Sequence, residues 1–305
     1  MVINNNNYKF YGIGAAILAT LIWSGNFIVA RGVIHEIPPV SLAFYRWMTA
    51  TILLAPFAIR SLKAELPVIK KNWKYLLIIS FFGITAYNTL IYIAGTYIPA
   101  MNLALIGTTS SPVMSILLAA IFLKEAIKPL RIIGLISCIT GILILLSKGS
   151  WDRLIHFHFT AGDWWILLAA LCFAIYNIMA RKRPSGITPV SFLFITFLIG
   201  TSFLFPAFLV ESNTSHTSIN WNWSLVLIIA YLGIGNSIIS FLCWNIAISR
   251  LGAARTALFG NLIPIFSSFE AVILLGEKIT SIHIISGLLV IGGLLLANLS
   301  SKPKN

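Results

Sequence analysis

Long apolar runs separated by short polar segments form the dominant pattern of the chain. Each run has close to the roughly 20 residues that an α-helix needs to cross about 30 Å of hydrocarbon. The first run is too long for the apolar core of a signal peptide, so we expect it to be retained as a helix. The ten expected spans are 10–31, 40–60, 74–97, 100–123, 129–148, 162–181, 188–210, 223–248, 252–275 and 281–300. The pattern predicts an all-α integral membrane protein with ten transmembrane helices.

Composition agrees with this prediction. Hydrophobic residues make up 58% of the 305 residues and charged residues only 10%, whereas a soluble domain carries about 25% charged residues. This balance excludes a disordered chain, an ordinary soluble enzyme and a nucleic-acid-binding domain, although the net charge is +13. The expected surroundings are a lipid bilayer, with no nucleic acid as partner.

The distribution of Lys and Arg predicts the orientation. If the N-terminus is cytoplasmic, sixteen of the 21 basic residues fall on the cytoplasmic side, four fall outside and Arg46 lies within a span. Cytoplasmic loops of membrane proteins carry such an excess. We therefore expect both termini in the cytoplasm and the chain in the cell (inner or plasma) membrane.

The two halves of the chain match each other. Residues 21–31 align with 171–181 at an offset of 150, and further along the chain than Trp73 and Trp223 the offset becomes 152. The matched pairs include Pro39 and Pro189, Pro56 and Pro206, Trp73 and Trp223, Pro112 and Pro264, and Glu125 and Glu277. We predict two repeats, 1–150 and 151–305, with five helices each. Because five is odd, the repeats have inverted topology (5+5), a common architecture of secondary transporters whose binding site lies near mid-membrane.

Several short motifs occur in order along these halves. They are Trp23-Ser24-Gly25-Asn26-Phe27, Phe44-Tyr45-Arg46, Ser111-Pro112 with Leu123-Lys124-Glu125, and Ile263-Pro264 with Leu275-Gly276-Glu277. With them the chain resembles, over nearly its whole length, the ten-helix EamA-type members of the drug/metabolite transporter superfamily. It departs at Lys124, where the second half has Gly276. The resemblance implies export or exchange of small metabolites, amino acids above all, by alternating access.

Polar side chains recur at helical spacing inside two of the spans. Asn88 and Tyr92 share one face of span 74–97, and Asn236, Ser240 and Trp244 share one face of span 223–248. Because polar groups avoid lipid, these faces predict the walls of a central cavity. The candidate substrate-binding residues are Trp23, Asn26, Asn88, Tyr92, Thr108, Ser111, Tyr176, Asn177, Asn236, Ser240, Trp244 and Asn261. The alternative is that Ser and Thr bond their own backbone and Asn a neighbouring helix.

Two full charges, Arg46 and Glu270, also lie within spans. Both are expected roughly 8–9 Å below the outer boundary at about 1.5 Å per residue. They are candidates for gating or coupling, either as an ion pair or in a shared polar network; alternatively, Arg46 extends toward the headgroups or Glu36. Asn261 and Glu270 face opposite sides of one helix unless Pro264 breaks it.

Small residues are frequent in spans 129–148 and 281–300. Gly134, Gly141, Gly287, Gly292 and Gly293 predict close helix contacts there, including a possible dimer contact. We expect a monomer or a weak homodimer.

No motif of an enzyme is present. Walker A, HExxH and GxSxG sequences are absent, and Cys138, Cys172 and Cys243 lie in apolar runs. We expect no catalytic residue, metal or cofactor; His156 and His158 are a weak metal candidate. The first hypothesis is a secondary transporter of small polar metabolites, most readily an amino-acid exporter. The alternative is uptake or exchange of a nucleotide-like or cationic metabolite, which aromatic side chains could hold.

Overall fold

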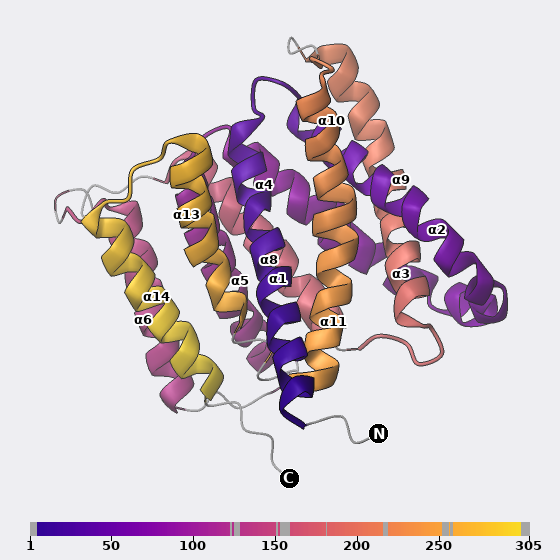
Figure 1. The fold of residues 1–305 in the computed structure, drawn as a ribbon, viewed down its shortest axis with the longest axis horizontal. Helices are drawn as coiled ribbons and strands as arrows, with labels where there is room; N and C mark the ends of the chain where they lie inside the picture. The colour runs from indigo at the N-terminus through magenta and orange to yellow at the C-terminus, as the bar shows by residue number, and fades with distance from the viewer. Residues whose placement is uncertain are drawn as a thin grey trace.

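The computed structural model describes residues 5–122, 124, 129–150, 152, 159–180, 182–215, 219–251, 256 and 259–299. Every regular element in these ranges is helical, and the helices lie side by side in one bundle (Figure 1). Helix α1 begins and α14 ends at the same end of the bundle. The all-helical prediction is confirmed for the described residues.

The elements follow the chain in this order. Residues up to 150 form α1 (Asn5–Gly32), α2 (Pro39–Lys71), α3 (Trp73–Ser80), η1 (Phe81–Ala86), α4 (Tyr87–Gly95), α5 (Ala100–Phe122) and α6 (Pro129–Leu146). Later residues form α8 (Ala161–Ala180), α9 (Pro189–Thr214), α10 (Trp223–Ala230), η2 (Tyr231–Ile239), α11 (Ser240–Leu251), η3 (Gly260–Leu262), α13 (Ile263–Leu275) and α14 (Ser281–Leu299).

Eight of these helical stretches are long and apolar enough to cross a membrane, and Gly260–Leu275 and Ser281–Ala297 are shorter apolar helices. They fall where the ten spans are expected, with one clear difference in length. Helix α2 continues to Lys71, whereas its apolar run ends at residue 60, because a helix can extend beyond the apolar stretch with charged residues. Glu125 and the first residues of span 252–275 lie outside the described residues.

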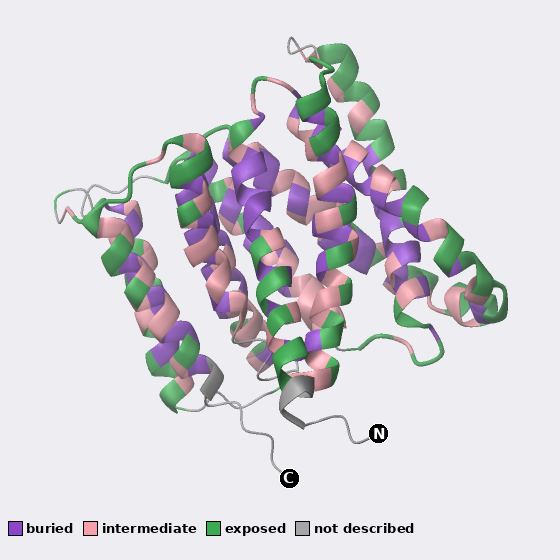
Figure 2. Cartoon of the chain, viewed as in Figure 1, coloured by how far each residue is buried: buried purple, intermediate pink, exposed green. Residues whose placement is uncertain are grey.

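Burial separates an inner from an outer layer. Figure 2 shows buried residues concentrated toward the middle of the bundle and exposed ones on its outer faces. Large apolar side chains are exposed on the outer helices, among them Ile136, Ile273 and Leu288. Such faces suit a lipid solvent, in which apolar side chains need no cover.

Two helix pairs, α2 with α9 and α6 with α14, each join one helix of the first half to one helix of the second. In the first, Thr51 on α2 and Thr201 on α9 share a hydrogen bond of 3.3 Å between their hydroxyls. In the second, Ser137 on α6 donates to the Leu289 carbonyl on α14 at 2.8 Å. The residues of the first bond are 150 apart in sequence and those of the second 152, which are the two offsets of the sequence repeat.

The α6/α14 pair depends on glycine. A Cβ at Gly134 would lie 2.5 Å from the Gly293 carbonyl oxygen, and one at Gly141 would lie 2.9 Å from the Ser286 carbonyl oxygen. The expected close contact is therefore confirmed at Gly134, Gly141 and Gly293. Gly287 and Gly292 meet nothing within 4 Å, so they do not serve this contact.

Two spans contain π-helical segments, η1 in Trp73–Gly95 and η2 in Trp223–Leu251. Their first residues, Phe81 and Tyr231, are related by the offset of 150. η1 has six residues and η2 nine. A π-helical turn accommodates an extra residue inside an α-helix, and both segments lie in the interval where the offset rises to 152.

Two carboxylates accept hydrogen bonds from backbone N–H groups in the first turns of helices. Glu211 accepts hydrogen bonds from the Val40 and Ser41 backbone N–H groups at the start of α2. Glu277 does the same for Ala100 and Met101 at the start of α5. Unpaired N–H groups and the helix dipole make this end of a helix favourable for negative charge.

Candidate functional site

Arg46, on α2, lies at the centre of a buried polar cluster. Its side chain is only 3% exposed. The guanidinium donates to Asn26 Oδ1 at 2.6 Å, Asn88 Oδ1 at 2.9 Å, the Tyr92 hydroxyl at 2.8 Å, Asn236 Oδ1 at 2.7 Å and Ser237 Oγ at 3.0 Å. We call these six residues the arginine cluster.

All five acceptors of Arg46 are uncharged. A buried charge is costly unless hydrogen bonds or an opposite charge replace its hydration. Here amide and hydroxyl dipoles do so, and the cluster keeps a full positive charge. Its members come from α1, α2 and α4 in the first half and from η2 in the second.

A second layer holds the cluster in place. The Asn236 amide donates to the Ile22 carbonyl at 2.8 Å, and Trp23 Nε1 donates to the Asn236 carbonyl at 3.1 Å. The Trp23 ring packs against Phe241 and Trp244, with centroid distances of 5.6 and 5.1 Å. Trp23 and Trp244 therefore lie one layer out from Arg46.

The ion pair between Arg46 and Glu270, one of the alternatives for these two charges, does not form. Glu270 on α13 accepts from Ser24 Oγ at 2.7 Å, and its Oε2 is buried without a hydrogen-bond partner among the described residues. Arg46 does not reach Glu36 either, since Glu36 Oε2 accepts instead from Asn222 at 3.5 Å. Equal depth of two residues does not place them on facing sides of their helices.

The remaining predicted residues lie outside the arginine cluster. Thr108 donates to the Ala104 carbonyl and Ser240 to the Gly235 carbonyl, so both bond their own helix, as the alternative interpretation has it. Ser111 Oγ and Asn261 Nδ2 are buried without a described partner. Asn177 is half-buried on α8.

The helix of Asn261 and Glu270 changes its geometry close to Pro264, the residue named as able to break it. Asn261 lies in the 3₁₀ turn η3, and α13 begins at Ile263 with Pro264 in its first turn. Proline suits that position because the first N–H groups of a helix lack intrahelical partners.

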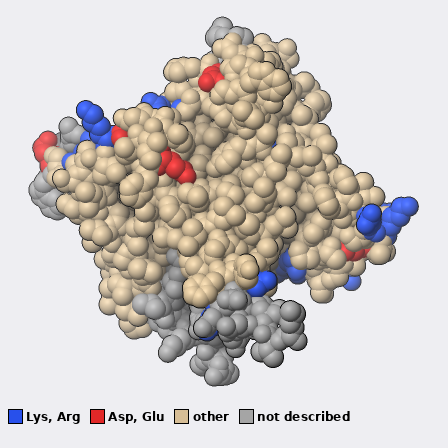
Figure 3. Space-filling model, viewed as in Figure 1, with Lys and Arg blue, Asp and Glu red and all other residues tan. Residues whose placement is uncertain are grey.

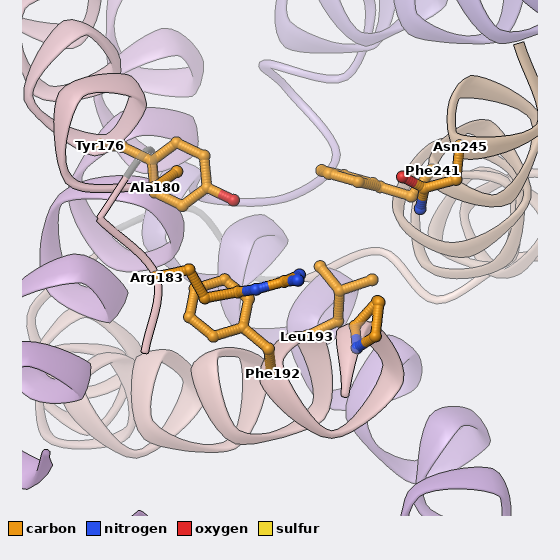
Figure 4. Close-up of a pocket in the computed structure, with 8 residues that line it drawn as sticks. Tyr176, Ala180, Arg183, Phe192, Leu193, Phe241 and Asn245 are labelled. Carbon is orange, nitrogen blue, oxygen red and sulfur yellow. The ribbon is translucent and has the colours of Figure 1, made fainter. Parts of the chain in front are cut away.

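A cavity of about 190 Å³ lies between α8, α9 and α11. Figure 4 shows Tyr176 and Phe241 on opposite sides of it, with Arg183 beside Phe192. Its lining residues are Tyr176, Ala180, Arg183, Pro189, Phe192, Leu193, Phe241 and Asn245. We call it the α8/α11 pocket. Of these residues the sequence prediction named only Tyr176; Arg183 was counted as a loop charge, and Asn245 gave no signal.

The side chains that form the walls of this pocket pack against elements next to the arginine cluster. Phe241 contacts Trp23, which bonds the backbone of Asn236. Tyr176 packs on η1 so closely that a Cβ at Gly83 would lie 2.2 Å from its ring. The pocket and the arginine cluster are thus separated by an aromatic layer next to the two π-helical segments.

Charged side chains are sparse on the face shown in Figure 3, where they lie mainly toward its margins. No group of three His, Cys, Asp or Glu that could hold a metal occurs among the described residues. His156 and His158 lie outside them.

Curated relatives cover nearly all of the chain. It is 26% identical over 291 residues to the uncharacterized transporter YyaM of Bacillus subtilis, covering 95% of this chain and 94% of the relative. It is 26% identical to a probable terminal-alkyne amino-acid exporter of Streptantibioticus cattleyicolor, covering 94% and 93%. It is 25% identical to a probable amino-acid metabolite efflux pump of Escherichia coli, covering 92% of each chain.

A solved crystal structure has the same fold, with a TM-score of 0.63 and 18% identity over 98% of both chains. The model of the EamA-like transporter family matches the chain twice, at residues 10–147 and 160–299. Transporter relatives and many apolar helices together indicate a multi-pass membrane protein of a transport family, not an enzyme family. The chain belongs to the EamA-like transporter family.

Proposed function

We propose that this protein is a secondary transporter that exports small polar metabolites, amino acids foremost, across the cytoplasmic membrane by alternating access. The observation that carries the proposal is the arginine cluster. It places a full positive charge among hydrogen-bonding side chains within helices long enough to cross a membrane. Ionisable groups inside membrane helices mark substrate or ion pathways by default.

The proposed architecture is an inverted repeat of residues 1–150 and 151–305. Contacts between repeat-related residues support it, because Thr51 meets Thr201 and Ser137 meets Leu289. Such self-pairs are expected where a pseudo-twofold axis passes between two helices. The two matches of the family model and the paired π-helical segments agree with it.

Alternating access would move one half against the other around the central site. Such a movement would change the hydrogen bonds of the arginine cluster, since Asn236 and Ser237 of the second half bond Arg46 of the first. We assign the polar contacts with substrate to Arg46, Asn26, Asn88, Tyr92 and Asn236. Trp23 and Trp244 are placed to contact the apolar part of a substrate. All these residues belong to one chain, so a monomer would contain the whole site.

The charge of the site favours one substrate class over the other. A buried arginine attracts a carboxylate and repels a cation. A cationic metabolite, one form of the alternative, would need a negative group, and Glu270, which accepts from Ser24, is not part of the arginine cluster. The names of the relatives from Streptantibioticus cattleyicolor and Escherichia coli, both concerned with amino acids, agree with a carboxylate-bearing substrate.

The proposed orientation places both termini in the cytoplasm. The end of the bundle at which α1 begins carries Lys9, Lys70, Lys71, Lys182 and Arg183, whereas Arg31, Lys148 and Lys278 fall at the other end. This excess follows the positive-inside rule.

The test is exchange of radiolabelled amino acids by the purified protein in proteoliposomes. We expect saturable exchange of at least one amino acid, and a loss of about tenfold or more in Arg46→Gln, because charge-assisted hydrogen bonds are the strong ones. Arg60→Gln is the matched control, since Arg60 is exposed on the same helix, and it should transport normally. Equal exchange by Arg46→Gln and the wild type would refute the assignment, and no exchange of any amino acid would refute the function.

A further inference from the structure

The α8/α11 pocket has a distinctive combination of side chains. It contains one cation, Arg183, one amide, Asn245, and aromatic rings, but none of its eight lining residues is acidic. Arg183 lies over the Phe192 ring with its Cζ 5.9 Å from the centroid. The guanidinium therefore lies over an aromatic ring, and no carboxylate among the lining residues neutralises its charge.

We propose that the α8/α11 pocket binds a small carboxylate-bearing ligand with an apolar body, and that it is the cytoplasmic access site for the substrate of the transporter. This inference rests on the proposed function and names the substrate class and the place of first contact. The guanidinium of Arg183 would hold the carboxylate by paired hydrogen bonds, the geometry for which arginine is suited.

The aromatic walls account for the apolar part of the ligand. Tyr176 projects from α8 and Phe241 from α11 across the same space (Figure 4). Rings facing one another bury a flat or branched apolar group at little conformational cost. Asn245 lies on the Phe241 side and can hydrogen-bond a second polar group of the ligand, such as an ammonium.

The size of the cavity limits the ligand. Pockets for drug-sized molecules have roughly 300–1,000 Å³, and this one has about 190 Å³. An amino acid or a short organic acid suits a pocket of that size.

The position of the pocket connects it with the arginine cluster. Tyr176 packs against η1 at Gly83, and Phe241 packs against Trp23, which bonds Asn236 beside Arg46. A carboxylate released by Arg183 would therefore meet the second cation, Arg46, once this aromatic layer opens. The π-helical segments next to the layer are suited to such a rearrangement, since π-helical turns recur at functional sites.

The binding test uses purified full-length protein and three probes that separate the charges. They are 3-phenylpropionate, which has only the carboxylate, phenethylamine, which has only the ammonium, and L-phenylalanine, which has both. We expect isothermal titration calorimetry to detect saturable binding of 3-phenylpropionate and L-phenylalanine but not of phenethylamine.

Substitutions then locate the site. Arg183→Gln should weaken binding of 3-phenylpropionate about tenfold or more, the usual scale for losing a charged hydrogen-bonded partner. Arg183→Lys should restore part of the affinity, because it keeps the charge without the fork geometry. Lys182→Gln is the matched control, since Lys182 is adjacent, exposed like Arg183 and not part of the pocket lining. Unchanged melting temperatures without ligand would show that the variants fold.

Three results would overturn the proposal: no binding of either carboxylate, equal binding of phenethylamine, or equal affinity in Arg183→Gln and Lys182→Gln. Exchange in proteoliposomes is measured separately. If binding depends on Arg183 but no exchange occurs, the assignment of the pocket stands and the transport function is refuted. If exchange occurs but binding does not depend on Arg183, the transport function stands and the assignment of the pocket is refuted.

Discussion

At the scale of single residues, Arg46 is the unusual feature of the protein. Its five hydrogen-bond partners are uncharged, and it is buried among membrane-length helices. Its repeat-related residue, Thr196, bonds the Phe192 and Leu193 carbonyls of its own helix. A buried arginine at this position is therefore a feature of the first half only, since the second half has a hydroxyl there that bonds its own helix.

Arg46→Lys should lower the free energy of unfolding by about 2–3 kcal/mol, because an ammonium has three donors and leaves buried acceptors unsatisfied. The measurement is unfolding of the purified protein in detergent, followed by circular dichroism. Arg60→Lys on the exposed part of α2 is the control and should change stability by less than about 0.5 kcal/mol. If the two variants unfold alike, the cluster does not stabilise the fold.

At the scale of elements, close helix contacts and helix irregularities position the site. The α2/α9 and α6/α14 crossings join the halves, while η1 and η2 interrupt the two spans that carry Tyr92 and Asn236. A π-helical turn shifts the rotational register of the residues that follow it. Such a turn also brings the carbonyl five residues back within reach, and Ser240, which shares a helical face with Asn236 in the sequence pattern, donates to the Gly235 carbonyl of its own helix.

Gly134→Ala should destabilise the α6/α14 contact by about 1–3 kcal/mol, the usual cost of overpacking. Its Cβ would lie 2.5 Å from the Gly293 carbonyl oxygen, so the backbones must separate. Thermal unfolding of the variant measures the effect. Gly287→Ala on α14 is the control, since its Cβ meets nothing within 4 Å, and it should be neutral or stabilising. A Gly134→Ala protein as stable as the control would contradict the close contact.

At the scale of the whole molecule, basic residues and bundle geometry define two ends with different charge. The α8/α11 pocket lies at the end that carries Lys182 and Arg183, and the arginine cluster is buried behind it. In the proposed orientation the pocket therefore lies on the cytoplasmic side of the aromatic layer of Trp23, Tyr176 and Phe241.

The orientation can be tested by labelling single cysteines in a background without Cys138, Cys172 and Cys243. Asn213→Cys, at the exposed end of α9, should react with a membrane-impermeant maleimide in intact cells. Lys182→Cys should react only after permeabilisation, because the proposed orientation places the basic end in the cytoplasm. The reverse pattern would invert the topology and place the pocket outside.

The number and positions of the helical spans were determined by the sequence, because apolar length and helical period are local properties of a chain. The sequence also identified Asn26, Asn88, Tyr92 and Asn236 as polar groups of interest, since polar residues in lipid-length helices are costly. Only the tertiary structure decided which of them meet. It directed Arg46 to these four residues and to Ser237, gave Glu270 a bond with Ser24, and formed the pocket around Arg183. The physical reason is that sequence position determines the depth of a residue along its helix, whereas packing against neighbouring helices determines the direction in which its side chain points.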